Sequence, residues 1–228
     1  LTGNSANNIL DGGLGLDTLI GGAGDDVYLI DNKDDVTTEL AGEGYDTVRS
    51  LVDYTLSNHI EALILMGISS SKGTGNNLNN MIEVETIKND IGELVNINHT
   101  LTGGLGKDTL KGGSGDDTYI IESTDIADII IEKSNEGIDN IESYVSYELS
   151  DNIENIFLQG SSSIDAYGNS LNNILIGNDA NNVLNGRAGN DTLKGGLGND
   201  VYVFGRGAGQ DLVDNTDANN GTDKVLFN

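Results

Sequence analysis

The sequence predicts an all-β protein, specifically a flattened right-handed solenoid of parallel strands. Three observations carry this prediction. A nine-residue glycine–aspartate repeat occurs six times in strict register, a longer duplication connects the repeats, and no segment reads convincingly as a long helix. Repeats at a short fixed period are typical of solenoids, because each repeat packs only against its neighbours.

The repeats come in three pairs: GGLGLDTLI–GGAGDDVYL at Gly12–Leu29, GGLGKDTLK–GGSGDDTYI at Gly103–Ile120, and GRAGNDTLK–GGLGNDVYV at Gly186–Val203. Aspartate is always sixth. We expect positions one to six to form a turn whose glycines adopt left-handed backbone angles. Positions seven to nine then form a short strand, with the eighth side chain pointing inward. These eighth residues are Leu19, Tyr28, Leu110, Tyr119, Leu193 and Tyr202. Two repeats make one coil, so strands pair with copies one coil away, about 4.8 Å along the axis.

A longer duplication joins the repeats. Gly44–Leu65 aligns with Gly137–Leu158 at an offset of 137 − 44 = 93, whereas Leu101–Tyr119 aligns with Leu184–Tyr202 at an offset of 83. The difference of ten places an insertion near Glu83–Asn98, which we expect to be a surface loop. Apolar residues alternate with polar ones in the connecting segments, as in strands. We therefore expect one continuous domain over residues 1–228, with repeat blocks at about 1–46, 94–139 and 168–223 and connectors at about 47–93 and 140–167.

The chain is strongly acidic, with 37 acidic and 11 basic residues and a net charge of −26. This balance argues against nucleic acid or an anionic membrane surface as a partner, since both require clusters of Lys and Arg. It suits divalent cations, because two carboxylates about 4 Å apart repel each other by roughly 4 kcal/mol at an effective dielectric near 20. No membrane-spanning run is present, so we expect no membrane insertion by this chain. Cysteine is absent, so no disulfide stabilises the chain.

The spacing of the acidic residues predicts where cations would bind. Four pairs share the sequence separation 35 − 17 = 18, namely Asp17–Asp35, Asn8–Asp26, Asn173–Asp191 and Asn182–Asp200. Five more pairs allow for longer turns: Asp26–Asp46, Asp108–Asp128 and Asp191–Asp211 at 20, Asp117–Asp139 at 22, and Asp200–Asp223 at 23. Each pair is expected to stack across one coil, with Glu39 and Glu132 nearby. Calcium takes six to eight hard oxygen ligands, and stacked carboxylates with turn carbonyls can supply them.

These residues resemble the RTX (repeats-in-toxin) haemolysin-type calcium-binding family, and the similarity extends over nearly the entire chain. The resemblance implies a parallel β-roll, type I secretion, and calcium-dependent folding outside the bacterial cell. It also implies that the sixth-position aspartates and the carbonyls at turn positions two and four bind metal. The sequence departs from the pattern in position two of four turns, which holds Asn4, Asn169, Asn178 or Arg187. It also departs at His99, which is sixth in a turn without glycine.

The complete set of expected metal ligands can now be given. The acidic members are Asp17, Asp26, Asp35, Asp46, Asp108, Asp117, Asp128, Asp139, Asp191, Asp200, Asp211, Asp223, Glu39 and Glu132. The glycines are Gly13, Gly15, Gly22, Gly24, Gly104, Gly106, Gly113, Gly115, Gly189, Gly196 and Gly198, and the amide residues are Asn8 and Asn182. Together they predict about six to ten calcium ions.

Two groups of residues admit a functional and a structural interpretation. Tyr28, Tyr119 and Tyr202 would form a sugar-stacking strip if they were exposed, but inward packing at the end of each block is the favoured interpretation. The two histidines, His59 and His99, are expected at ordinary surface positions.

The sequence therefore predicts a non-catalytic calcium module of a larger secreted bacterial protein such as a toxin, adhesin or enzyme. It contains no nucleophile–base set that would make it an enzyme. The expected partners are calcium ions and, during export, the type I secretion machinery, and we expect a monomer. The alternative is an extracellular adhesin segment or a carbohydrate-binding accessory module. Since the chain opens within a repeat, we expect it to be part of a longer protein.

Overall fold

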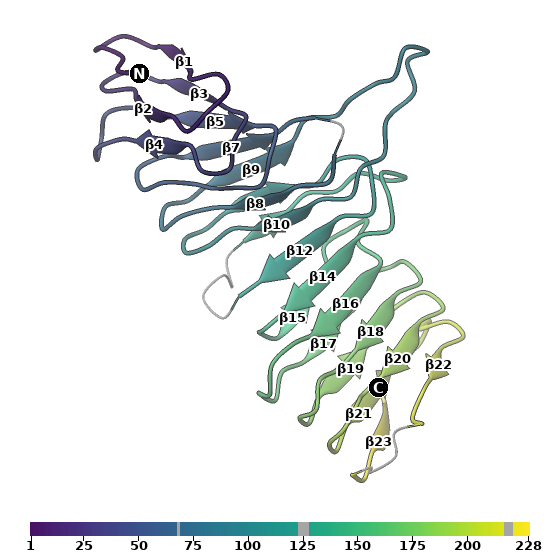
Figure 1. Cartoon of the computed structure of the whole chain (residues 1–228). Helices are drawn as coiled ribbons and strands as arrows, with labels where there is room; N and C mark the ends of the chain where they lie inside the picture. The colour runs from purple at the N-terminus through teal and green to yellow at the C-terminus, as the bar shows by residue number, and fades with distance from the viewer. Residues whose placement is uncertain (68, 123–127, 217–220) are drawn as a thin grey trace. The chain divides into compact units, whose positions relative to one another are not determined.

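The computed structural model describes residues 1–67, 69–122, 128–216 and 221–228, and over these residues it contains 23 β-strands and no helix (Figure 1). The strands form two compact units. Unit 1 comprises Leu1–Asp117 with Ala127–Ile131, and unit 2 comprises Thr118–Ile126 with Glu132–Asn228. The predicted all-β parallel solenoid is confirmed, whereas its right-handed coiling and the single continuous domain stay predictions.

Unit 1 contains a seven-stranded parallel sheet in the order β1-β3-β5-β7-β9-β11-β13. Its strands are β1 (Ile9–Asp11), β3 (Val27–Ile30), β5 (Thr47–Ser50), β7 (Ala62–Leu65), β9 (Met81–Val84), β11 (Thr109–Lys111) and β13 (Ile129–Ile130). The even-numbered strands pair separately, as β2 (Thr18–Ile20) with β4 (Val36–Thr38), and as β6 (Tyr54–Thr55), β8 (Lys72–Thr74) and β10 (Thr100–Thr102) in that order.

Unit 2 repeats this arrangement with two parallel sets of strands. The first runs in the order β12 (Thr118–Ile121), β14 (Asn140–Ser143), β16 (Asn155–Leu158), β18 (Ile174–Ile176), β20 (Thr192–Lys194) and β22 (Leu212–Val213). The second is a five-stranded sheet of β15 (Tyr147–Glu148), β17 (Ala166–Tyr167), β19 (Val183–Asn185), β21 (Val201–Phe204) and β23 (Lys224–Phe227). Odd and even strands alternate along the chain between the two sets, as a coil requires (Figure 1).

The strand register matches the predicted coil length. Ile9 pairs with Val27, a step of 27 − 9 = 18, and the same step joins Val183 to Val201 and Ile174 to Thr192. After a repeat block the step lengthens to 47 − 27 = 20, so that Val27 pairs with Thr47 and Thr109 with Ile129. Within the connectors the steps are 62 − 47 = 15, from Thr47 to Ala62, and 81 − 62 = 19, from Ala62 to Met81. The strands keep their register because the turns absorb every change in length.

The core is built from the eighth residue of each repeat. Leu19, Leu110 and Leu193 are fully buried, and so are Tyr28 and Tyr119, while Tyr202 is 2% exposed. Burying one such side chain stabilises a fold by about 1.5–3 kcal/mol. The predicted inward packing of the three tyrosines is confirmed, which removes them as a sugar-stacking strip.

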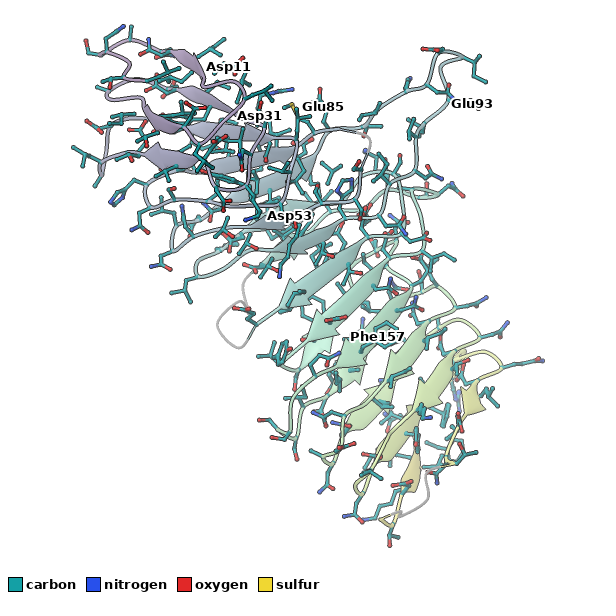
Figure 2. All side chains as sticks on the ribbon, viewed as in Figure 1. Asp11, Asp31, Asp53, Glu85, Glu93 and Phe157 are labelled. Carbon is teal, nitrogen blue, oxygen red and sulfur yellow. The ribbon has the colours of Figure 1, made fainter. Side chains whose placement is uncertain are left out.

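The ten-residue insertion lies where it was predicted, apart from its start. Glu83 still belongs to β9, so the extra loop begins after Val84 and ends before His99. Within it, Lys88 and Leu94 form an isolated antiparallel bridge. The loop projects away from the strands of unit 1, and Glu93 lies near its outer end (Figure 2). The insertion therefore leaves the strand stacking of unit 1 intact.

Candidate metal centres

Each repeat turn depends on glycine for two different reasons. At positions two and four the backbone is left-handed, as at Gly22 (φ 92°) and Gly24 (φ 119°), and glycine reaches these angles without a steric penalty. At position one the reason is space, because a Cβ on Gly21 would collide with Asp26 Oδ2 and Glu39 Oε1. Arg187 is the exception in position two, and it adopts φ 70° there. The glycines thus bring backbone and carboxylates close together.

The acidic residues of unit 1 form a hydrogen-bonded column across successive coils. Asp26 Oδ1 accepts the backbone N–H of Asn8 at 2.6 Å, and Asp46 Oδ1 accepts the N–H of Asp26 at 2.8 Å. Glu61 Oε2 continues the column by accepting the N–H of Asp46 at 2.8 Å. The same contact joins Asp35 to Asp17 at 3.0 Å, and Asp128 to Asp108 at 2.8 Å. The predicted stacking of these pairs is confirmed.

Unit 2 contains matching columns. Asp191 Oδ1 accepts the N–H of Asn173 at 2.8 Å, and Asp211 Oδ1 accepts the N–H of Asp191 at 2.9 Å. In the second column, Asp200 Oδ1 accepts the N–H of Asn182 at 2.8 Å, and Asp223 Oδ1 accepts the N–H of Asp200 at 2.8 Å. Sequence separations of 18, 20 and 23 therefore all bring a carboxylate to the backbone of the preceding coil.

The best-defined candidate centre is the acidic cluster of Asp26, Glu39 and Asp46 in unit 1. Each contributes one carboxylate oxygen, and these oxygens lie within 4.8 Å of one another. The side chains are 0%, 5% and 1% exposed. Asp26 Oδ2, Glu39 Oε2 and Asp46 Oδ2 have no hydrogen-bond partner. Buried carboxylate oxygens without a partner are strongly unfavourable unless a cation or proton neutralises them.

Tyr28 fixes the position of Glu39 in the acidic cluster. Its hydroxyl donates a hydrogen bond to Glu39 Oε1 and accepts one from the N–H of Gly21 at 2.9 Å. Tyr28 is the eighth residue of its repeat, so the core side chain also orients a carboxylate. Burial raises the pKa of Tyr28 well above its usual range, which keeps the hydroxyl protonated and able to donate.

The electrostatics of the acidic cluster show the cost of leaving it without a cation. Burial raises the pKa of Glu39 from 4.5 to about 7, and the charges of Asp46 and Asp26 also raise it, against the hydrogen bond from Tyr28. Burial likewise raises the pKa of Asp46 from 3.8 to about 6, assisted by the charges of Glu61 and Asp26. In the metal-free protein, protons therefore compete for the positions that a cation would neutralise.

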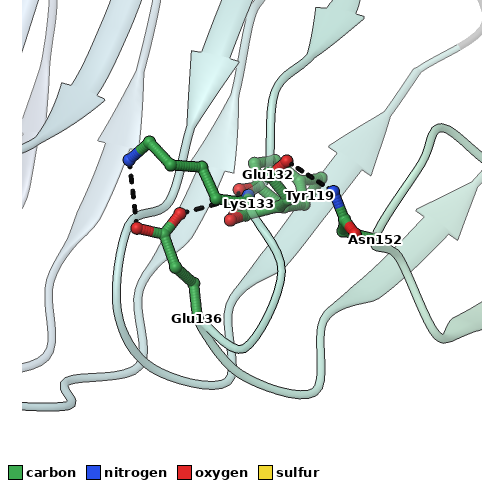
Figure 3. Close-up of polar contacts among 5 residues, drawn as sticks. All are labelled: Tyr119, Glu132, Lys133, Glu136 and Asn152. Atoms are coloured by element: carbon green, nitrogen blue, oxygen red, sulfur yellow. Dashed lines mark hydrogen bonds and ion pairs between the residues drawn. The ribbon is translucent and has the colours of Figure 1, made fainter.

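Unit 2 reproduces the tyrosine–glutamate contact. Tyr119, also an eighth residue, donates its hydroxyl hydrogen bond to Glu132 Oε1 (Figure 3). Asn152 Nδ2 donates to the backbone carbonyl of Glu132 at 3.0 Å, and Lys133 Nζ pairs with Glu136 at 3.0 Å (Figure 3). Glu132 is 7% exposed. Glu132 lies at the duplication offset from Glu39, 132 − 39 = 93, and it is buried and oriented in the same manner.

The remaining expected carboxylates differ in burial. Asp108, Asp117 and Asp200 are fully buried, Asp139 and Asp191 are 1% exposed, and Asp35 is 6% exposed. Asp17, Asp128, Asp211 and Asp223 are half-buried. Asp117 Oδ1 accepts the N–H of His99 at 2.6 Å within unit 1. Burial raises the pKa of Asp191 to about 6, and the charge of Asp211 acts in the same direction.

The two amide residues of the expected ligand set are engaged differently from the aspartates. Asn8 Oδ1 accepts the N–H of Asn4 at 2.7 Å. Asn182 Oδ1 accepts the N–H of Asn178 at 2.9 Å, while its Nδ2 donates to the carbonyl of Ile164 at 2.6 Å. Both side-chain oxygens therefore satisfy their own turn rather than reaching the preceding coil.

One expectation from the sequence is wrong. His99 is not at an ordinary surface position, because it is 3% exposed and its Nδ1 contacts Ser71 Oγ at 3.1 Å. The placement was missed because of the insertion. Ser71 and His99 are 28 residues apart, which equals one coil of two repeats, 18 residues, plus the ten inserted residues. Burial lowers the pKa of His99, so a neutral imidazole occupies a position that aspartate holds in the repeats.

Sequence reasoning also missed two glutamates. Glu61 and Glu154 accept the N–H groups of Asp46 and Asp139, each at 2.8 Å and each across a sequence separation of 15. The two glutamates are themselves related by the duplication offset, 154 − 61 = 93. The duplication therefore could have identified Glu61 and Glu154 as a related pair. The nine-residue period could not, because a separation of 15 residues is not a multiple of nine.

The acidic cluster fits calcium. Oxygen atoms bound to one Ca²⁺ ion at about 2.3–2.6 Å lie at most about twice that distance apart. The acidic cluster meets this limit, because one oxygen from each of its three carboxylates lies within 4.8 Å of the other two. They are hard, anionic oxygen donors, and they lie against turn backbone whose carbonyls are the other ligands calcium prefers. The described residues include no helix that is long and apolar enough to cross a membrane.

Comparison with known proteins agrees with this geometry. The family model for the RTX calcium-binding nonapeptide repeat matches in 4 copies, over residues 1–29, 100–120 and 167–202. A curated relative, the endo-1,3-1,4-beta-glycanase ExsH of Rhizobium meliloti (strain 1021), is 39% identical over 66 residues. That alignment covers 29% of this chain and 14% of the relative. With its phased turns and stacked carboxylates, this chain contains RTX calcium-binding nonapeptide repeats over the matched residues.

Proposed function

We propose that the chain is a non-catalytic module that binds calcium between its stacked turns and folds as it does so. The observation that carries the proposal is the acidic cluster, in which three buried carboxylates each have an oxygen without a hydrogen-bond partner. Three buried carboxylates destabilise the folded state unless a cation neutralises them, because unpaired buried charge is unfavourable.

The proposed ligands follow from the columns. Asp26 Oδ1 accepts the N–H of Asn8 and Asp46 Oδ1 accepts the N–H of Asp26, while Oδ2 of each has no hydrogen-bond partner and can bind an ion. Carbonyls at turn positions two and four, such as those of Gly22 and Gly24, would complete the shell. Asn8 and Asn182 are left out of this set because their side-chain oxygens accept hydrogen bonds within their own turns.

Calcium binding and folding then become one equilibrium. With a net charge of −26, the repeat blocks at low calcium are unfolded, which helps the chain to pass an exporter. With calcium at ten times the dissociation constant of a site, each ion contributes about 1.4 kcal/mol. Several sites together favour the folded state at the millimolar calcium of an extracellular medium. These considerations support a role in a protein exported from bacteria by a type I system.

The decisive experiment compares two neighbouring aspartates. Asp26 belongs to the acidic cluster, whereas Asp25 is exposed and its Oδ1 accepts the N–H of Tyr45 at 2.9 Å. Asp26→Asn should raise the calcium midpoint of folding about tenfold or more, which is about 1.4 kcal/mol. Asp25→Asn removes the same charge one residue away and should leave the midpoint nearly unchanged. Far-UV circular dichroism and calorimetry of the same calcium titration measure both.

Two outcomes would refute the proposal. One is equal β-sheet content in excess chelator and in calcium. The other is an equal response of the two variants, because general charge reduction rather than ligation would then control folding. Magnesium should be much less effective than calcium, since it requires near-ideal octahedral geometry at shorter distances.

The parent protein is a separate question. The matched relative is named as a glycanase, and only 14% of it aligns, so an accessory role beside a polysaccharide-active region is the second candidate. The buried tyrosines offer no stacking platform for a sugar, since Tyr28, Tyr119 and Tyr202 all lie in the core. A glycan-array signal from the calcium-loaded chain would favour this second candidate over a purely structural module.

A further inference from the structure

Four turns of the chain carry asparagine instead of aspartate in position six, and all four share the pattern G-N-x-x-N-N. They are Gly3–Asn8, Gly75–Asn80, Gly168–Asn173 and Gly177–Asn182. Position two is also asparagine, where most repeat turns have glycine. Two substitutions that recur together in the same turn point to a joint role for the two side chains.

The turn Gly168–Asn173 in unit 2 shows what the two amides do. Asn169 Nδ2 donates to the carbonyls of Ser150 and Ile153 at 2.7 and 2.8 Å. Asn173 Nδ2 donates to the carbonyls of Ile153 and Glu154, both at 3.1 Å. The two side chains are 8% and 1% exposed. The carbonyls of the preceding coil are therefore bound by N–H groups of these side chains.

The amide oxygens close the same turn. Asn173 Oδ1 accepts the N–H of Asn169 at 2.8 Å, and Asn169 Oδ1 accepts the N–H of Leu171 at 2.8 Å. Every polar group of the pair is used, and each is neutral. This differs from an aspartate turn, where the carboxylate accepts an N–H of the preceding coil and keeps one anionic oxygen.

The other two interior turns repeat the arrangement. In unit 1, Asn76 Nδ2 donates to the carbonyls of Ser57 and Ile60 at 2.7 and 2.8 Å, and Asn80 Nδ2 donates to Ile60 at 3.0 Å. In unit 2, Asn178 Nδ2 donates to Gln159 and Ser162 at 3.2 and 2.9 Å, and Asn182 Nδ2 to Ile164 at 2.6 Å. In all three turns the amide in position two thus donates to carbonyls 19 and 16 residues earlier, and the amide in position six also donates to a carbonyl of that coil.

We propose that the sixth residue of each turn decides whether the turn holds a calcium ion. Aspartate makes a metal turn. Asparagine in position six, together with asparagine in position two, makes a metal-free turn. In such a turn the two amide groups donate hydrogen bonds to backbone carbonyls of the preceding coil, where a calcium ion would otherwise bind. The inference rests on the proposed function for the aspartate turns and adds that the G-N-x-x-N-N turns are closed without calcium.

The placement of these turns gives them a role in folding. Asn80 and Asn173 each donate to the carbonyl of the connector glutamate, Glu61 or Glu154, that ends an acidic column. The metal-free turns therefore join each connector to the repeat block that follows it. The connector coils, which lack a stacked pair of sixth-position aspartates, can retain structure at low calcium and offer a preformed edge on which the next block folds.

Hydrogen–deuterium exchange of the whole chain in excess EGTA and in calcium tests the inference. In EGTA, we expect slow exchange at 147–185, which spans most of the second connector and the two G-N-x-x-N-N turns after it. These connector peptides should exchange several-fold more slowly than peptides covering the aspartate turns at 186–200. If the connector peptides exchange as fast as the block peptides in EGTA and gain protection only with calcium, the inference fails while calcium-coupled folding stands. If no peptide responds to calcium, the proposed function itself fails.

A matched pair of variants tests the role of the sixth residue. Asn173→Asp places a carboxylate against the carbonyls of Ile153 and Glu154. It should abolish the protection of the 147–185 coils in EGTA and restore it in calcium, with one more ion bound by calorimetry. Asn172→Asp adds the same charge at an exposed neighbour, whose Oδ1 accepts the N–H of Asn190 at 2.7 Å, and should leave the protection in EGTA unchanged. Equal behaviour of the two variants would overturn the inference.

Discussion

Replacing Glu39 by glutamine should have opposite effects with and without calcium. Glutamine keeps an oxygen that can accept the Tyr28 hydroxyl hydrogen bond, so the change is confined to charge. In chelator the variant should be more stable than the wild type, because repulsion with Asp26 and Asp46 disappears. In calcium it should bind less tightly, because a charged ligand is lost and affinity depends on ligand charge.

The raised pKa of Glu39 gives the size of the effect in chelator. Burial is the largest cause of its rise from 4.5 to about 7, and the charges of Asp46 and Asp26 add to it. This rise corresponds to about 3 kcal/mol, since one pKa unit is about 1.4 kcal/mol. Because the pKa rise already contains the repulsion from Asp46 and Asp26, it measures burial and repulsion together.

The assay is far-UV circular dichroism in EGTA with increasing trimethylamine N-oxide, which favours compact states. Glu39→Gln should fold at a lower concentration of this osmolyte than the wild type. Glu93→Gln makes the same charge change in the exposed insertion loop (Figure 2) and should not shift the transition. If Glu39→Gln leaves the chelated state unchanged or destabilises it, repulsion in the acidic cluster is not what calcium relieves.

Three further predictions concern the same centre. Tyr28→Phe removes the hydroxyl that bonds both Glu39 Oε1 and the buried N–H of Gly21. The calcium-loaded protein should therefore lose about 1–3 kcal/mol of stability, as measured by urea unfolding. An unchanged stability would contradict the orienting role of the hydroxyl. Gly21→Ala should abolish calcium-induced folding of unit 1, because the new Cβ would collide with Asp26 and Glu39. Gly205→Ala should be tolerated, because a Cβ there meets open space. If circular dichroism shows that both variants fold equally well, the turn has room for a side chain in position one. Because the pKa values of Glu39 and Asp46 are raised to about 7 and about 6, the folded chelated chain binds more protons than the unfolded chain. Its stability should therefore fall as pH rises from about 4 to 7, and calorimetry should show calcium affinity weakening as pH falls below about 7; an affinity independent of pH would contradict the assignment.

The sequence by itself determined the coil and its pitch. Nine-residue periodicity fixed the turns, the inward eighth residues and the stacking of every second repeat, because every copy repeats the same local geometry. The longer separations of 20 and 23 were also readable, because Asp46 and Asp223 end the tripeptides GYD and GTD that follow the repeat blocks. Asp46 and Asp223 accordingly lie over Asp26 and Asp200.

Only the tertiary structure decided what individual side chains do within a turn. Asn182 and Asp200 occupy equivalent sequence positions, yet their oxygens are used differently. Asn182 Oδ1 accepts an N–H of its own turn while its Nδ2 donates to a carbonyl of the preceding coil, whereas Asp200 Oδ1 accepts an N–H of the preceding coil. The difference arises because an amide carries N–H donors that backbone carbonyls attract, while a carboxylate carries none. Glu61 and the burial of His99 escaped prediction because their contacts cross sequence separations of 15 and 28, which the nine-residue period does not produce. The nine-residue period determines which residues of successive coils lie over one another. The hydrogen-bonding partners available at each position then determine the orientation of its side chain.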